Sequence, residues 1–217
     1  SAQKIFGCDF YGLYGLTETS GAGTCLNPEG HAAGKLRSCG KPYPGIEIEV
    51  RGDDNQAVAT GEVGEIVIRH GIIMKGYWNR PEATEEAIRD GWFSTGDAGY
   101  FDEEGYLYIH DRVKDMIVSG GENVYPAEVE GVLYKHDAIA EVAVIGLPDE
   151  KWGEAVTAVV ALNEGQELTL EDVREFAVIH LAKYKLPLRL HKVDELPRNP
   201  AGKVLKFVLK EELSSDD

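Results

Sequence analysis

The chain has 217 residues, enough for one large domain or for two domains of about 100 residues each. Hydrophobic residues make up 43% of it and aromatic residues 9%, values at which a globular core forms. The net charge of −16 divides evenly, −8 up to His110 and −8 after it, which argues against a basic nucleic-acid face and against adhesion to anionic membranes.

The three cysteines, Cys8, Cys25 and Cys39, form no CxxC pair. We interpret them as free thiols in a reducing compartment and expect a cytoplasmic protein. No apolar run approaches the roughly 18 residues of a membrane span, so we expect no transmembrane segment, and no targeting signal is visible. Because the chain starts without Met and reaches a motif almost at once, we expect it to be part of a longer protein.

Residues 11–24 alternate glycines with hydroxyl side chains, and Glu18 is their only charge. Backbone N–H groups and hydroxyls in such a loop can bind phosphate oxygens, while one carboxylate can hold a divalent metal that bridges them. An ordinary polar loop has the same composition. Neither a Walker sequence nor a GxGxxG sequence is present, which excludes two common nucleotide sites.

The region from 36 to 110 has the pattern of short β-strands separated by glycines. Alternation of apolar and polar residues, and a hairpin turn at 102–105, predict strands at 46–51, 65–69, 100–101 and 106–109. Pro81 begins one predicted helix, at 81–88. Several short strands of this kind indicate a small barrel or sandwich.

Residues 91–97 are predicted to form a loop just before a strand. Asp97 at its end is suited to accept two hydrogen bonds from a ribose diol. Asp is also common in turns for purely local reasons, so this loop by itself does not identify a nucleotide site.

Residues 111–126 place four charged side chains within their first five positions, then a short apolar run and the pair Gly120-Gly121. A strand that ends in this cluster would present an arginine fork and carboxylates, where an anionic or polyhydroxyl ligand can bind. The glycine pair allows backbone conformations closed to other residues. The alternative is a solvated turn between two strands.

Beyond this stretch the pattern predicts an α+β domain. Helices are expected from Pro126, after the Thr169–Asp172 capping box, and at 205–213, with strands at 141–147, 155–162 and 188–193. Before the last helix, two prolines and a glycine constrain the loop that carries Lys203. Many loop lysines are simply solvated.

Five segments stand in the order and spacing of the adenylate-forming (AMP-binding) superfamily, which this chain resembles over nearly its whole length. In appearance it is most similar to the fatty or aryl acyl-CoA ligases. The segments are Tyr14–Glu18, Ser94–Asp97, Asp111–Asp115, Ser119–Pro126 and Pro197–Lys203.

The resemblance implies a ligase that uses ATP, Mg²⁺ and coenzyme A: a carboxylate attacks the α-phosphate to give an acyl-adenylate, and the CoA thiol then displaces AMP. By position it implies these roles: Tyr14 against adenine, Thr17 on phosphate, Glu18 on Mg²⁺, Asp97 and Arg112 on ribose, and Lys203 bridging the substrate carboxylate and the phosphate during adenylation. Thr17, Glu18 and Lys203 would be the catalytic residues.

The resemblance also implies an α+β fold with two domains. Residues 1–112 would be the β-rich, barrel-like tail of the large AMP-binding domain. Residues 113–217 would be the mobile C-terminal domain, a compact α+β unit with a short sheet and flanking helices. Lys114 would be the hinge, and Ser119, Gly120 and Gly121 would line the tunnel for the CoA thiol.

The family's upstream phosphate loop and acyl pocket have no counterpart in this sequence. We therefore expect the chain to be inactive alone, and residues 1–35 to be disordered or rearranged. Two alternatives stay open: a stand-alone binding or interaction module, and an enzyme whose acceptor is a carrier protein or oxygen. The sequence does not specify the carboxylic acid or the oligomeric state.

Overall fold

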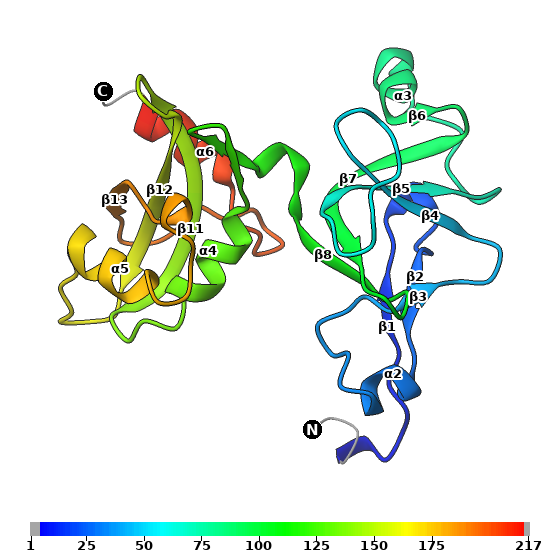
Figure 1. Cartoon of the computed structure of the whole chain (residues 1–217), viewed down its shortest axis with the longest axis horizontal. Coiled ribbons are helices and arrows are strands. Elements are labelled where there is room, and N and C mark those ends of the chain that lie inside the picture. Colours follow the sequence, from blue (N-terminus) through cyan, green and yellow to red (C-terminus); the bar gives the residue numbers. More distant parts are fainter. Residues whose placement is uncertain (1–4, 215–217) are drawn as a thin grey trace. The chain divides into compact units, whose positions relative to one another are not determined.

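The computed structural model describes residues 5–214 (Figure 1). The chain divides into two compact units, one up to Val113 and one from Lys114. Within residues 5–214 the strands form three sheets, two in the first unit and one in the second. Helices accompany the sheets in both units, and the predicted α+β class is confirmed.

The first unit contains a three-stranded and a five-stranded antiparallel sheet. The small sheet has the order β1-β2-β3. In the larger sheet the order is β4-β5-β7-β6, and β8 also pairs with β7. The strands are β1 (Gly12–Tyr14), β2 (Thr24–Leu26), β3 (Lys41–Pro42), β4 (Glu47–Arg51), β5 (Gly64–Arg69), β6 (Ile88–Arg89), β7 (Trp92–Phe101) and β8 (Leu107–Arg112).

Leu107 connects the two sheets. Its backbone N–H donates to the Gly40 carbonyl at 2.8 Å, and its own carbonyl accepts from the Cys39 N–H at 2.8 Å. A Cβ on Gly40 would lie 1.9 Å from the Cys25 carbonyl carbon, so only glycine fits at this crossing. One apolar cluster lies around it, formed by Tyr14, Ile46, Val50, Ile66, Ile68 and Leu107.

The segment up to residue 35 was expected to be disordered or rearranged, and this expectation is wrong for residues 12–35. They contain β1, β2, the 3-10 turn η1 (Thr17–Thr19) and α2 (Pro28–Ala32). Pairing of β1 with β2 satisfies their backbone groups, and Tyr14 and Leu26 are buried. Residues 1–4, also covered by the expectation, lie outside the described residues.

Of two other local predictions, the helix at Pro81 is confirmed and the loop at 91–97 is wrong. The helix begun by Pro81 is present as α3 (Pro81–Ala87). Residues 91–97 were predicted as a loop, but from Trp92 onward they belong to β7. The strand continues there because Phe93 and Ser94 pair with β5, a partner that the local sequence does not reveal.

The second unit has one five-stranded sheet with helices on both faces. The order is β10-β9-β12-β11, and β13 pairs with β12 in parallel. A parallel pair needs a crossover, and α5 lies in it. The 3-10 turn η2 (Val113–Asp115) spans the boundary between the two units. The elements of the second unit are strands β9 (Ile117–Ser119), β10 (Glu122–Val124), β11 (Ile139–Asp149), β12 (Gly153–Leu162) and β13 (Arg189–Lys192), helices α4 (Pro126–Leu133), α5 (Leu170–Ala177) and α6 (Lys206–Ser214), and the 3-10 turn η3 (Lys183–Lys185).

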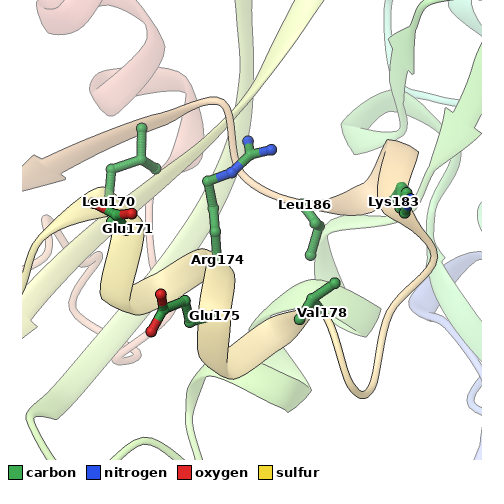
Figure 2. A pocket seen from close by; sticks show the side chains of 7 residues that line it. All are labelled: Leu170, Glu171, Arg174, Glu175, Val178, Lys183 and Leu186. Carbon is green, nitrogen blue, oxygen red and sulfur yellow. The ribbon is translucent and has the colours of Figure 1, made fainter.

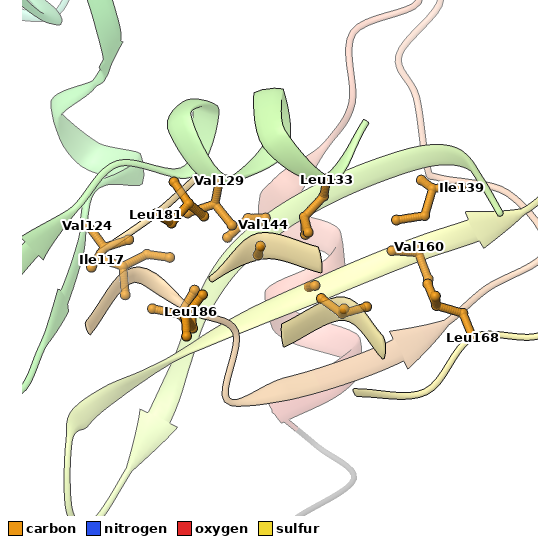
Figure 3. Packing of buried hydrophobic residues seen from close by; sticks show 14 of the residues in the cluster. Ile117, Val124, Val129, Leu133, Ile139, Val144, Val160, Leu168, Leu181 and Leu186 are labelled. Carbon is orange, nitrogen blue, oxygen red and sulfur yellow. The ribbon is translucent and has the colours of Figure 1, made fainter. Parts of the chain in front are cut away.

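Alternation along β11 and β12 supplies a core on each face of this sheet. On one face Val144 and Val160 pack with Val129 and Leu133 of α4, and with residues of α5 (Figure 3). On the other face, a second cluster includes Leu209 of α6 together with Ala143, Ile145, Leu147, Val159 and Leu196. The sheet is thus covered on both sides.

The capping box predicted at the start of α5 is present. The Thr169 hydroxyl accepts from the Asp172 N–H at 3.2 Å, and the Asp172 carboxylate accepts from the Thr169 N–H at 2.8 Å. These bonds satisfy donors that the first helical turn leaves unpaired.

We predict that Leu133→Ala destabilises the second unit by about 2–5 kcal/mol, because it leaves a cavity at a fully buried position. Denaturant unfolding followed by assigned amide NMR signals measures this for each unit separately. Tyr134→Ala, at the next position and exposed, is the matched control and should cost about 0.5 kcal/mol or less. Equal effects of the two changes would contradict the assigned core.

Candidate functional site

Asp97 and Arg112 face each other across two neighbouring strands. They are directly paired residues of β7 and β8, and Arg112 Nε lies 3.0 Å from Asp97 Oδ1. The Asp97 side chain is 12% exposed and that of Arg112 is 39% exposed, so the carboxylate is largely enclosed while the guanidinium reaches solvent. The antiparallel register therefore brings two of the predicted site residues into contact.

Tyr14 occupies the other side of the same carboxylate. Its hydroxyl donates to Asp97 Oδ2 at 2.8 Å. Burial, and then the nearby Asp97 charge, raise the pKa of Tyr14 well above its ordinary value, so the phenol stays protonated and can act as a donor. The Thr95 hydroxyl accepts from the Asp97 N–H at 3.1 Å and fixes the backbone beneath the carboxylate.

Thr17 and Glu18 lie in the turn η1 that follows β1. Thr17 is exposed and Glu18 is half-buried. The Glu18 carbonyl accepts from the Met74 N–H at 2.8 Å, and the Ser20 hydroxyl donates to the Ile72 carbonyl at 3.0 Å. Thr17 and Glu18 thus lie on a turn that hydrogen bonds to residues 72 and 74 stabilise.

Tyr77 contacts Glu18, and sequence reasoning missed this contact. Its hydroxyl donates to Glu18 Oε1 at 3.0 Å; burial, followed by this bond, raises the pKa of Tyr77. No signal in the sequence could have found the contact, because the two residues are 59 positions apart and no local pattern joins them.

The Glu18 carboxylate could be the single protein ligand of a Mg²⁺ ion. Mg²⁺ commonly takes one or two protein carboxylates and completes its shell with substrate phosphates and water. Between residues 5 and 214, no group of three or more His, Cys, Asp or Glu side chains is arranged to hold a metal. A dedicated all-protein cage is therefore absent from the part of the chain that the structure describes.

In the second unit, Gly120 and Gly121 form the two-residue turn between β9 and β10. Their φ angles are +63° and +85°, as in the type I′ turn that favours glycine. Ser119, just before them, is buried and pairs with both Glu122 and Gly153. The glycine loop is thus a rigid hairpin tip.

Trp152 lies against this tip and was not predicted as a site residue. Its carbonyl accepts from the Gly120 N–H at 2.8 Å, and a Cβ on Gly120 would lie 2.8 Å from the indole ring. Trp152 is 38% exposed. A tryptophan in a polar turn between two strands was the only signal available in the sequence.

Lys203 and Lys114 are both exposed. Lys203 follows Gly202 in the loop before α6, and no residue within 5–214 hydrogen-bonds or ion-pairs with its ammonium group. Lys114 is the middle residue of η2, where the second unit begins. No hydrogen bond between described residues joins the Gly120 hairpin to the Lys203 loop.

A separate cavity of about 650 Å³ lies beside α5, and none of the predicted site residues lines it. Figure 2 shows its lining side chains coming from α5 and from the segment at η3. The lining residues are Leu170, Glu171, Arg174, Glu175, Val178, Lys183 and Leu186.

Two family profiles match the sequence. The AMP-binding enzyme profile matches residues 1–78, and the AMP-binding enzyme C-terminal domain profile matches residues 128–203. The chain belongs to the adenylate-forming, AMP-binding enzyme superfamily. It corresponds to the C-terminal portion of that family, as predicted, and its relatives include fatty acid, aryl and succinylbenzoate CoA ligases.

Among the relatives is the long-chain fatty acid–CoA ligase FadD13 of Mycobacterium tuberculosis, 51% identical over 93% of this chain and 40% of its own length. A fatty acid–[acyl-carrier-protein] ligase of Streptomyces coeruleorubidus is 44% identical over 98% of this chain and 41% of its own. Solved structures of the Bacillus subtilis o-succinylbenzoate CoA synthetase also match. One holds its acyl-adenylate (TM-score 0.85, 41% identity), and one holds ATP and magnesium (TM-score 0.83, 40% identity).

These two solved structures share the mixed α+β architecture described above, and each match covers 96% of this chain and 42% of the solved chain. The chain thus spans about two fifths of the length of the relatives that it matches. Within residues 5–214, no helix is both long enough and apolar enough to cross a membrane.

We predict that Gly120→Ala displaces the Trp152 indole, whereas Gly121→Ala does not. Both changes place a Cβ at positive φ, a strain of roughly 1–2 kcal/mol, but only the Cβ on Gly120 would meet the ring. The indole N–H signal of Trp152 in NMR spectra reports the displacement. An unmoved signal in Gly120→Ala would contradict the packing of Trp152 on this hairpin.

Proposed function

We propose that this chain is the C-terminal part of an acyl-CoA synthetase, an acid–thiol ligase that activates a carboxylic acid with ATP and passes the acyl group to coenzyme A. Pairing of Asp97 with Arg112 and Tyr14 is the observation that supports this most directly, because a carboxylate held by two donors is suited to bind a ribose diol. Relatives that are CoA ligases support the same reaction class.

In the first step an oxygen of the substrate carboxylate forms a bond to the α-phosphorus, and the bond from that phosphorus to the pyrophosphate oxygen breaks. Asp97 accepts hydrogen bonds from the ribose diol, and the Arg112 guanidinium 3.0 Å away holds the Asp97 carboxylate in position. The Lys203 ammonium lies against the substrate carboxylate and the phosphate. It stabilises the negative charge that gathers on the phosphate oxygens in the transition state.

Thr17 and Glu18 serve the phosphates in this proposal. The exposed Thr17 hydroxyl donates to a phosphate oxygen, and Glu18 would hold Mg²⁺ from its braced turn. When bound, Mg²⁺ supplies charge neutralisation to the phosphate oxygens. The B. subtilis relative solved with ATP and a magnesium ion supports the use of ATP and Mg²⁺.

In the second step the CoA sulfur bonds to the acyl carbon, the bond to the AMP oxygen breaks, and the thiol proton passes to solvent. We assign Ser119, Gly120 and Gly121 to the path of the thiol-bearing arm, since a glycine turn allows close approach by a ligand. Rotation of the second unit about Lys114 would exchange the Lys203 loop for this hairpin between the steps.

The chain by itself should be inactive in this proposal, because the upstream phosphate loop and acyl pocket are not in its sequence. A stand-alone binding module is the alternative, and calorimetric titration of the chain with AMP and with CoA distinguishes the two. Tight nucleotide binding by this chain alone would favour the binding module. The carrier-protein relative favours a second alternative, a pantetheine thiol on a protein as the acceptor.

We predict that Lys203→Ala, in the full-length enzyme that contains these residues, lowers adenylation by on the order of 10²–10³, as expected for losing one preorganised donor. Pyrophosphate release measures that step. Thioester formation from supplied acyl-adenylate should stay near the wild-type rate. Lys210→Ala, a lysine of α6, is the control and should leave both steps unchanged. An equal loss in both half-reactions would refute the role given to Lys203.

We predict the opposite pattern for Lys114→Pro. Proline fixes φ near −65° and restricts the preceding residue, so it impedes rotation at η2. Thioester formation from supplied acyl-adenylate should fall while adenylation is retained. Lys114→Ala leaves the backbone free and should keep both half-reactions. Unaltered thioester formation in Lys114→Pro would argue against a pivot at this position.

A further inference from the structure

The loop that carries Lys203 is a small, closed hairpin. Arg198 and Val204 form an isolated antiparallel bridge at its base. The Asn199 N–H donates to the Lys203 carbonyl at 2.9 Å, and the Gly202 N–H donates to the Asn199 carbonyl at 2.8 Å. Gly202 has a φ of +82°, which favours glycine at the turn. The backbone around Lys203 is therefore held in one conformation.

Asn199 fixes the tip from within. Its Oδ1 accepts from the Ala201 N–H at 3.0 Å and from the Lys203 N–H at 2.9 Å. Asparagine commonly stabilises turns by such bonds to its own following backbone. The side chain thus determines the path of the chain as it enters Lys203.

Arg198 fastens this tip to the sheet. Its Nη1 donates to the Gly202 carbonyl at 2.7 Å, and its Nη2 donates to Glu141 Oε1 on β11, also at 2.7 Å. The second oxygen of Glu141 accepts from the Leu196 N–H at 3.4 Å. One planar guanidinium therefore spans the loop. One carboxylate, that of Glu141, binds both this guanidinium and the backbone of Leu196 in the segment that leads into the loop.

The Arg198–Glu141 pair lies at the surface, which indicates that it positions the Lys203 loop and adds little to the stability of the fold. Arg198 and Glu141 are 41% and 36% exposed, and exposed ion pairs contribute little to stability. The anchors for the unit as a whole are apolar: Leu196 before the loop and Leu209 after it are both buried in the same cluster. These two leucines lie before and after the loop and do not set the position of its tip. Arg198 does, through its hydrogen bond to the Gly202 carbonyl.

We propose that Arg198, held by Glu141, is a positioning residue that sets where the Lys203 ammonium is presented. This rests on the proposed function of Lys203 in adenylation. Arg198 itself touches neither substrate nor nucleotide in this proposal. Because a displacement of about 1 Å at a reacting group lowers the rate by on the order of 10², a loosened tip should slow adenylation selectively.

The kinetic test uses the full-length enzyme that contains these residues. Arg198→Ala should lower pyrophosphate release by on the order of 10² while thioester formation from supplied acyl-adenylate stays near wild type. In Arg198→Lys the single ammonium group can bind either the Gly202 carbonyl or Glu141, but not both. Its rate of pyrophosphate release should lie between those of wild type and Arg198→Ala. Arg174→Ala is the matched control, because Arg174 also donates to a backbone carbonyl, that of Pro187, but outside this loop. It should leave both half-reactions unchanged.

A second readout reports geometry without activity. In the 217-residue chain, Arg198→Ala should speed amide hydrogen exchange at Ala201 and Lys203, the two N–H groups bonded to Asn199, while the Asp172 amide of the α5 cap keeps its wild-type rate. Slow exchange at Ala201 and Lys203 in this variant would overturn the proposal. So would normal adenylation by Arg198→Ala when Lys203→Ala is inactive. Full adenylation by Lys203→Ala itself would instead remove the proposed function, and this inference with it.

Discussion

The carboxylate of Asp97 is the constraint on which the first unit depends. A largely enclosed charge is tolerated only when it is paired, and here each oxygen has its own donor, the Tyr14 hydroxyl on one side and the Arg112 guanidinium on the other. Tyr14 comes from a strand 83 positions earlier, in a different sheet. The Tyr14–Asp97 hydrogen bond thus joins a residue of the small sheet to one of the larger sheet. In the proposed function, a ribose diol would compete with Tyr14 for Asp97.

In the second unit, one set of residues stabilises the fold and a different set positions the candidate lysine, Lys203. Its two apolar clusters, one on each face of the sheet, hold the helices in place, whereas the lysine stands outside them on a polar hairpin. Glu141 connects the two, since it belongs to β11, an edge strand of the sheet, and binds the loop through Arg198. Polar bonds from the edge of a rigid sheet thus reach a group that has to stay accessible to a ligand.

Elements with strong local signals could be predicted from the sequence. The helices after Pro81, Pro126 and Thr169 begin with a proline or a capping box, and β11 and β12 are long apolar runs. The strands β1 to β3 have two or three residues each and exist only through pairing with one another, so no periodicity indicates them.

The same limit applies to the candidate site. Its motifs were recognised from short segments, but the contacts of Tyr77 with Glu18 and of Trp152 with Gly120 were not. Each joins residues from separate segments of the chain, and residue type gives no indication of such a partner. The position of Arg198 was likewise visible in its motif, whereas its bond to Glu141, 57 positions away, required the folded sheet.

Helix α6, which covers one face of the sheet in the second unit, comes late in the chain. Ile145 and Leu147 lie on the face that Leu209 of α6 closes, and a ribosome adds Leu209 long after both of them. Until then a strip of apolar surface on a growing chain faces water, a situation in which unfinished domains associate wrongly or engage chaperones. The order of synthesis therefore leaves this face of the sheet exposed to aggregation until α6 docks.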